Sequence, residues 1–138
     1  MTLGEKYYNI AMDDLLYLEA SNVEGYYNQP TNLCQQVAEK LMKSVVADYY
    51  TEDDLENILR SHSLKRLANA INLIIPSSNF DKKALAYLSD FYYETRYPGP
   101  DYVKIDKETY EECKQIMYTC KDEIDRILLK LQENSDDK

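Results

Sequence analysis

The sequence has few of the residues that interrupt or cross-link a chain: 3 glycines, 4 prolines, 3 cysteines, one histidine and no tryptophan among 138 residues. It also lacks a glycine-rich phosphate loop, a Gly-x-Ser-x-Gly elbow and a His-Glu-x-x-His pair, which excludes the enzyme classes that depend on them. Because there is one histidine, any histidine-based acid–base mechanism must use His62. No apolar run approaches the roughly 20 residues that span a bilayer.

Negative charge is in excess, and this bears on partners and compartment. The chain has 16 Lys+Arg against 25 Asp+Glu, a formal net charge of −9 at pH 7. Binding to a DNA duplex depends on clustered lysines and arginines, so this balance argues against an autonomous duplex-binding protein. Residues Met1–Glu5 lack the basic and apolar regions of a signal peptide. We therefore expect a cytoplasmic protein with no membrane partner.

The three cysteines do not form a disulfide framework. Cys113 and Cys120 are seven positions apart, which puts them on one face of a helix, whereas Cys34 stands alone. Free cysteine is commonly a small buried residue, so we predict three buried thiols in a reducing compartment. A zinc site made of these cysteines and His62 is the alternative, although the Cys-x2-Cys spacing is absent. We expect no metal and no cofactor.

Apolar residues recur every three or four positions along most of the chain, which predicts helices and not strands. One such stripe contains Cys34, Val37, Leu41 and Val45. The first predicted helix ends before Gly25. The second runs from Asn28 or Thr31, either of which can cap it, to about Asp48, and a further segment begins at the capping-box-like Thr51–Asp54. A third long helix runs from Ser61 or Ser63 to Pro76, the fourth ends at Arg96 ahead of Pro98–Pro100, and Asp106 can cap the last one.

Four or five amphipathic helices with short connections predict an all-α fold, an antiparallel four- to five-helix up-and-down bundle. A chain of 138 residues fits one domain. We expect a single helical domain over residues 1–133 and a polar C-terminal tail over residues 134–138.

Tyrosine is abundant, with 14 copies that include doublets at 7–8, 26–27, 49–50 and 92–93. Neighbouring helical positions point about 100° apart, so we expect one member of a doublet to face the core and the other to face outward. Such rings suit the boundary of a core, and near the predicted fourth helix they also suit a partner surface.

Two segments carry candidate binding residues. His62 lies at a predicted helix start, where holding the helix end is the structural alternative to a functional role. The other segment places Arg96 at a helix end beside Tyr92 and Tyr97, with Asp101 after the turn. A guanidinium beside aromatic rings suits recognition of a phosphate or a base, whereas attraction to the helix dipole explains Arg96 equally well.

Taken together and in order, several motifs resemble the HEPN domain over almost the whole chain. Ala11–Leu16 is similar to part of that family's first helix, and Cys34–Lys43 is similar to its Gln-Gln-Ala-Glu-Lys-x-x-Lys block. Ser61–Leu64 resembles its His-x-Leu helix start, and Arg96–Pro98 resembles its aromatic-rich Arg-Tyr-Pro signature. The resemblance implies a small helical bundle that dimerises and that is often encoded beside a minimal nucleotidyltransferase.

Many HEPN proteins are metal-independent ribonucleases with an Arg-x4-6-His motif at the dimer interface. Here the four residues after Arg96 lead to Asp101, and no histidine follows. We therefore expect that the isolated protein does not cleave RNA, because a carboxylate beside an arginine does not shuttle protons near pH 7. Some family members also carry a tyrosine two residues past that histidine, which the partner enzyme nucleotidylates, and Tyr102 lies one residue from that register.

The leading interpretation is a non-catalytic homodimer that binds a nucleotide or phosphate and acts with a minimal nucleotidyltransferase in a toxin–antitoxin-like pair. Its candidate binding residues are Arg96, Tyr92, Tyr97, His62 and Asp101, and Tyr102 is a candidate modification site. The first alternative is a divergent HEPN ribonuclease toxin that uses Arg96, Asp101 and His62 on RNA. The second is a helical adaptor that binds a protein through its tyrosine-rich faces and has no ligand.

Overall fold

The computed structural model describes residues 1–94 and 104–136, and these residues form six helices and no strand. The predicted all-α bundle is confirmed, with one short helix, α3, in addition to five longer ones. The helices are α1 (Leu3–Ala20), α2 (Asn28–Tyr49), α3 (Leu55–Leu59), α4 (Leu64–Ile74), α5 (Lys82–Glu94) and α6 (Lys107–Asp136).

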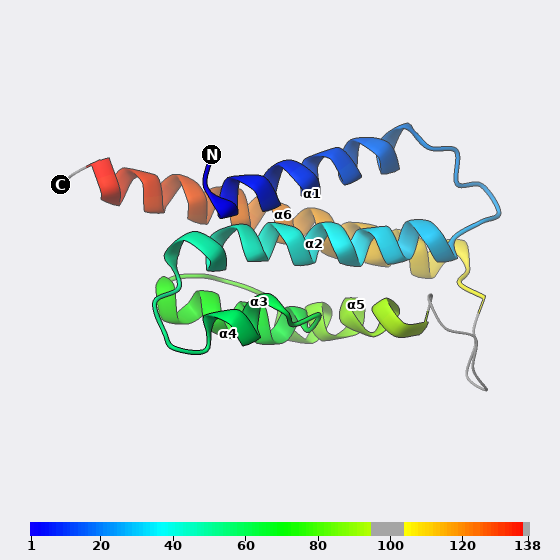
Figure 1. Ribbon diagram of the computed structural model, residues 1–138. Helices are drawn as coiled ribbons and strands as arrows, with labels where there is room; N and C mark the ends of the chain where they lie inside the picture. Colours follow the sequence, from blue (N-terminus) through cyan, green and yellow to red (C-terminus); the bar gives the residue numbers. More distant parts are fainter. Residues whose placement is uncertain (95–103, 137–138) are drawn as a thin grey trace.

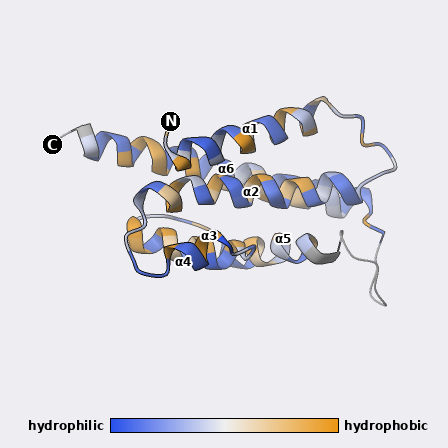
Figure 2. Cartoon of the chain, in the orientation of Figure 1, coloured by the Kyte–Doolittle hydropathy of each residue, from blue (hydrophilic) through white to orange (hydrophobic). Residues whose placement is uncertain are grey.

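The centre of the bundle is α2, which contacts all five other helices. In Figure 1, α1 lies along one side of α2, α4 and α5 lie along the other side, and α6 lies behind. The predicted α2 stripe is fully buried at Cys34, Val37, Leu41 and Val45. Hydrophobic and hydrophilic residues are interleaved along the helices (Figure 2), as a bundle requires when each helix turns one face inward. Large side chains from the other helices complete the core, among them Leu15, Leu67, Ile71, Leu88, Met117, Ile124 and Ile127.

The predicted cap of the last helix forms, and Ser63, one of the two predicted starts of the third long helix, caps α4. The side chain of Ser63 accepts a hydrogen bond from the backbone N–H of Arg66 (3.2 Å) at the start of α4. Asp106 accepts one from the backbone N–H of Thr109 (2.8 Å) at the start of α6. Each cap satisfies one of the four backbone donors that a helix start leaves open.

The other predicted caps are wrong. Neither Asn28 nor Thr31 caps α2, because that helix begins without a side-chain cap after Tyr27, and Asn28 Oδ1 accepts from the backbone N–H of Ile105 (2.9 Å). Thr51–Asp54 forms no capping box either. Asp54 accepts from the hydroxyl of Tyr50 (2.6 Å) and makes no side-chain cap. In both places the side-chain oxygen that could have capped the helix accepts a hydrogen bond from another residue instead, Ile105 for Asn28 and Tyr50 for Asp54.

The start of α1 is held against the end of α2. Thr2 and Glu5 form a capping box, with Thr2 Oγ1 accepting from the backbone N–H of Glu5 (3.1 Å). Asp48 accepts from the hydroxyl of Thr2 (2.6 Å) and from the backbone N–H of Gly4 (2.9 Å). A Cβ atom at position 4 would collide with the Asp48 carboxylate and the Ser44 carbonyl. Glycine is required there by this close approach.

The tyrosine doublets follow the prediction at positions 26–27 and not at 49–50, where both rings pack against the core. Tyr27 stacks on Tyr110 with ring centroids 5.6 Å apart, while Tyr26 is 81% exposed. Tyr50 is buried and Tyr49 is half-buried. At positions 7–8 both rings are half-buried, and the side chain of residue 93 lies outside the described residues.

The end of the chain differs slightly from expectation, because α6 continues to Asp136, past the position at which we expected the polar tail to begin. The division into a domain over 1–133 and a tail over 134–138 stays a prediction. The expected end of the fourth predicted helix at Arg96 lies outside the described residues. Within residues 1–94 and 104–136, no helix is both long enough and apolar enough to cross a bilayer.

Candidate functional site

A row of polar side chains runs along one face of α2 at four-residue spacing: Thr31, Gln35, Glu39 and Lys43. All four are buried, and among the described residues all six buried polar or charged residues lie on α2. Burying polar groups costs free energy unless they are paired. This face of α2 is therefore where the fold keeps polar groups in spite of that cost.

Glu39 is the hub of this polar row. One carboxylate oxygen, Oε2, accepts from Lys43 Nζ (2.9 Å), and the other, Oε1, accepts from Gln35 Nε2 (3.1 Å). Burial opposes the ionisation of Glu39, but the hydrogen bond and charge of Lys43, with hydrogen bonds from Gln35 and His62, hold the pKa of Glu39 below its ordinary value of 4.5. The buried pair is thus a carboxylate and an ammonium that neutralise each other.

His62 joins this hub from the connection between α3 and α4. Its Nδ1 lies 3.0 Å from Glu39 Oε1, and its backbone carbonyl accepts from Gln35 Nε2 (3.3 Å). Its ring stacks on Tyr92 of α5, with centroids 3.9 Å apart and ring planes 15° apart. The next residues fix the segment: Leu64 donates its N–H to Ser89 Oγ (2.8 Å) on α5. The start of α4 therefore lies beside the second half of α5, as antiparallel neighbours require.

The geometry decides which ring nitrogen carries the proton. A carboxylate only accepts hydrogen bonds, so Nδ1 of His62 must be protonated to bond Glu39. In the neutral ring this leaves Nε2 with its lone pair, and in the imidazolium it leaves Nε2 as a donor. The side chain of His62 is 36% exposed, whereas that of Glu39 is 9% exposed. The imidazole is thus held from the buried side and reaches solvent.

The structure brings together two of the six candidate residues predicted from the sequence, His62 and Tyr92. The other four, Arg96, Tyr97, Asp101 and Tyr102, lie outside the described residues.

Sequence reasoning missed Gln35, Glu39 and Lys43 as site residues, although they lie in the block that carries the family resemblance. The signal that could have found them is the spacing, because polar residues recur at positions 31, 35, 39 and 43, in register with the four-residue rise of a helix face. Two further oxygens of the polar row, Thr31 Oγ1 and Gln35 Oε1, are buried without a hydrogen-bond partner in the described part of the chain. Such unsatisfied groups cost stability and are typical of functional or strained places in a fold.

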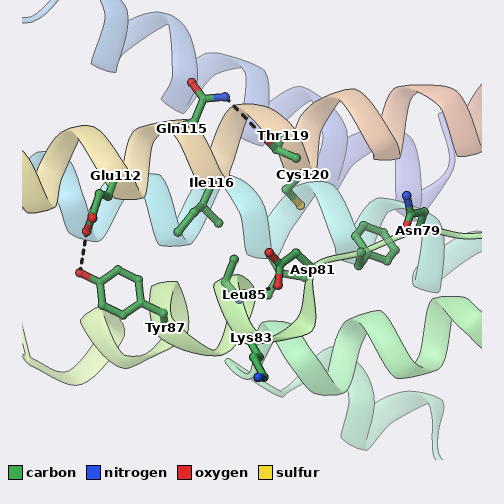
Figure 3. Close-up of a pocket in the computed structure, with 12 residues that line it drawn as sticks. Asn79, Asp81, Lys83, Leu85, Tyr87, Glu112, Gln115, Ile116, Thr119 and Cys120 are labelled. Carbon is green, nitrogen blue, oxygen red and sulfur yellow. Dashed lines mark hydrogen bonds between the residues drawn. The ribbon is translucent and has the colours of Figure 1, made fainter.

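A groove of about 700 Å³ lies between α5 and α6 (Figure 3). Its walls include Phe80, Leu85 and Ile116, and at one end the hydroxyl of Tyr87 bonds Glu112 Oε2 (3.2 Å) across the two helices. Neither His62 nor Tyr92, the two candidate residues within the described part of the chain, lines it. Apolar walls suit an apolar group better than a phosphate. The groove is therefore a different kind of site from the His62 cluster.

The three cysteines are free and buried, as predicted. Burial raises the pKa of Cys34, Cys113 and Cys120 each to about 12. A thiol with such a pKa carries almost no thiolate near neutral pH, so these residues are core side chains and not nucleophiles.

A family model described as HEPN domain matches residues 5–125. The matched range contains the polar row of α2, His62 and Tyr92. No curated protein and no solved structure matches the chain.

Proposed function

The chain belongs to the HEPN domain family, and on that premise we propose that it is a homodimer that binds a nucleotide or phosphate group, does not cleave RNA, and acts with a minimal nucleotidyltransferase in a toxin–antitoxin-like pair. The observation that carries the binding proposal is the His62 ring, held between Glu39 and Tyr92. Arg96 follows Tyr92 by four positions in the sequence.

Charge supports an anion at this end of the bundle. Although the whole chain has a net charge of −9, the Glu39 carboxylate next to His62 is compensated by Lys43. The hub therefore adds little repulsion toward a phosphate. In the proposed site Arg96 binds the phosphate through charge-assisted hydrogen bonds and His62 adds a donor. Tyr92 and Tyr97 supply ring surface for a base, and Asp101 supplies an acceptor.

Calorimetry tests the binding role. We expect the parent protein to bind a nucleoside triphosphate or monophosphate and Arg96→Ala to lose about 1.5–3 kcal/mol of binding free energy. Arg126→Ala is the matched control, because it removes the same charge from a 45% exposed side chain, paired with Glu123 on α6. Equal affinities in the parent and Arg96→Ala would contradict the proposal and leave the adaptor alternative.

The homodimer is proposed to bury the end of α5 that carries Tyr92, with Arg96 beyond it. Tyrosine and arginine are enriched in interface cores. Sedimentation at micromolar concentration should show at least two chains per particle in the parent protein. We also expect Tyr92→Ala to weaken this association, and a parent protein that is monomeric would contradict the proposal.

The partner is tested by co-expression. A minimal nucleotidyltransferase encoded beside this chain is expected to copurify with it, and Tyr102 is the proposed position for nucleotidylation. Mass spectrometry of the copurified chain should then show an added nucleotide that is absent from Tyr102→Phe. Modification that persists in Tyr102→Phe would exclude that position.

A second function, divergent ribonuclease, is favoured by one specific observation, the carboxylate-oriented imidazole of His62. Such a histidine is suited to proton transfer when Nε2 faces a substrate. Incubation with single-stranded RNA separates the two functions. We expect no cleavage; cleavage by the parent that is lost in both His62→Ala and Arg96→Ala would overturn the non-catalytic proposal.

A further inference from the structure

The outer side of α1 carries a stripe of large apolar side chains that nothing in residues 1–94 or 104–136 covers. Leu3, Ile10 and Tyr17 are 50%, 47% and 71% exposed. They are seven positions apart, which is almost two helical turns, so they lie along one line about 21 Å long. The inward face of the same helix is formed by other residues, Gly4, Ala11, Leu15 and Leu18, which are buried. Single exposed apolar residues are ordinary, but a line of three at heptad spacing is typical of a helix that packs on another helix.

Charged residues border this stripe. Lys6 and Asp13, also seven positions apart, are exposed, and their side chains have no hydrogen bond or ion pair with the described residues of the chain. On the other border, Asp14 is paired with Lys40 of α2 (2.8 Å). The border formed by Lys6 and Asp13 thus carries one unpaired positive side chain before Ile10 and one unpaired negative side chain after it.

We propose that this stripe is the contact between two copies of the chain, packed α1 against α1 in antiparallel orientation about a two-fold axis at Ile10. In that arrangement Ile10 meets Ile10 of the second copy, and Leu3 meets Tyr17. A residue before Ile10 also meets the residues that lie about as far after it on the same border of the stripe. Lys6 lies four positions before Ile10 and Asp13 three positions after it, so Lys6 faces Asp13 of the second copy to within about 1.5 Å along the axis, twice.

The sequence of the stripe favours a second copy as its occupant because the stripe is complementary to itself. The antiparallel arrangement places opposite charges opposite each other in both symmetry-related pairs, whereas in a parallel two-fold arrangement the Lys6 and Asp13 borders of the two copies would lie on opposite sides of the contact and would not meet. Its apolar rungs also match in the antiparallel arrangement, large residue to large residue at each of the three levels.

This interface is separate from the proposed dimer at the end of α5, because α1 makes no contact with α5. If both interfaces form, the chain assembles into particles larger than a dimer. The two proposals can therefore fail independently.

Sedimentation equilibrium of the full chain, at 16.2 kDa per copy, is the first test. Ile10→Asp should reduce the particle mass by half or more, because it places two carboxylates together at the axis. Leu16→Asp is the matched control, since Leu16 is on the same helix and 61% exposed but lies about 120° around the helix from Ile10. An unchanged mass in Ile10→Asp, or a parent protein that is monomeric, would overturn the inference. A fall from two chains to one in Ile10→Asp would support it and place the whole dimer on α1.

A charge exchange is the second test. Lys6→Glu should weaken association several-fold because it sets like charges against each other, and Lys6→Glu combined with Asp13→Lys should restore it. Within one chain these residues are about 10.5 Å apart along the helix, too far for an ion pair, so rescue requires two copies. Failure of the double variant to restore association would count against the antiparallel register.

A cross-link gives a readout that does not depend on a destabilising change. Ile10→Cys should form a disulfide-linked dimer under mild oxidation and Leu16→Cys should not, because only position 10 meets its own copy at the axis. The three native cysteines are buried and do not compete. Absence of the linked dimer from Ile10→Cys would overturn the two-fold axis proposed here.

Discussion

The two sides of α2 bury side chains of opposite character. One side carries Cys34, Leu41 and Val45, which are fully buried and apolar, and the other carries Gln35, Glu39 and Lys43, which are buried and polar. The apolar side stabilises the fold by removing surface from water, at roughly 25 cal/mol per Å². The polar side must first offset the desolvation of an ion pair, and such pairs are often no better for stability than apolar residues of the same size.

This difference between the two sides of α2 indicates that the polar side serves function. A fold that needed only stability would continue the apolar pattern around α2. Instead the polar side holds the partly exposed His62 in one orientation through Glu39 and places it against Tyr92. Specific orientation of an accessible imidazole is what this buried network adds to the protein.

The largest expected effect on the free energy of unfolding comes from removing one partner of the buried Glu39–Lys43 ion pair. Lys43→Met should lower the free energy of unfolding by about 3–5 kcal/mol, because it leaves the Glu39 carboxylate buried without its counter-ion. Urea unfolding measures this. Glu39→Gln added to Lys43→Met should recover part of the loss, since a neutral amide needs no counter-ion. A loss below about 1 kcal/mol in Lys43→Met would mean that the polar side carries no more energetic cost than a surface pair.

On the apolar side, Leu41→Ala should cost about 3 kcal/mol, within the range for a large-to-small change that leaves a cavity. The same urea experiment measures it. In contrast to Lys43→Met, no second substitution at a titratable residue should recover the loss, because the cost is a lost volume and not an unpaired charge. Recovery by Glu39→Gln would show that the two sides of α2 are coupled.

A smaller effect is expected where α1 meets the end of α2. Gly4→Ala should cost about 1–3 kcal/mol, because a methyl group collides with the Asp48 carboxylate and the Ser44 carbonyl. Thermal unfolding by circular dichroism detects this as a lower Tm. Adding Asp48→Ala removes one of the two collisions but also two hydrogen bonds, so it should not restore full stability. A Gly4→Ala protein as stable as the parent would show that α1 shifts to accommodate the methyl group.

The smallest effect is a difference in pH dependence between the two sides. Because the folded protein holds the pKa of Glu39 below its ordinary value of 4.5, the ionised carboxylate contributes stability above that value, and this contribution is lost as the pH falls through the folded pKa. Stability of the parent should therefore fall more steeply in acid than that of Glu39→Gln. Leu41→Ala should fall as steeply as the parent. Parallel pH profiles for the parent and Glu39→Gln would contradict the lowered pKa.

Much of the fold could be predicted from the sequence because the signals are local. The stripe that includes Cys34, Leu41 and Val45 predicted the buried face of α2, and Ser63 was one of the two residues predicted to begin α4. Both depend on residues within one or two helical turns of each other. Asn28 failed as a cap for the opposite reason, because its side chain bonds Ile105, 77 positions away.

The candidate site was only half predictable for the same reason. His62 stood out as the one histidine, and Tyr92 as part of an aromatic segment. Glu39 did not stand out, since a glutamate on an amphipathic helix is ordinarily on the solvated face. Its role depends on His62, 23 positions later, which packing brings to 3.0 Å.

By itself, the sequence determined that this protein is a bundle of helices, which residues face its core, and where His62 lies relative to a helix start, because hydrophobic periodicity and capping act over a few residues. Only the tertiary structure decided that Glu39 and Lys43 are buried partners of that histidine, that Tyr92 stacks on it, and that Leu3, Ile10 and Tyr17 stay uncovered on α1. These outcomes depend on which helix faces pack against each other. The sequence of one helix does not determine which of its faces another helix will cover, because that depends on how the helices are arranged in the bundle.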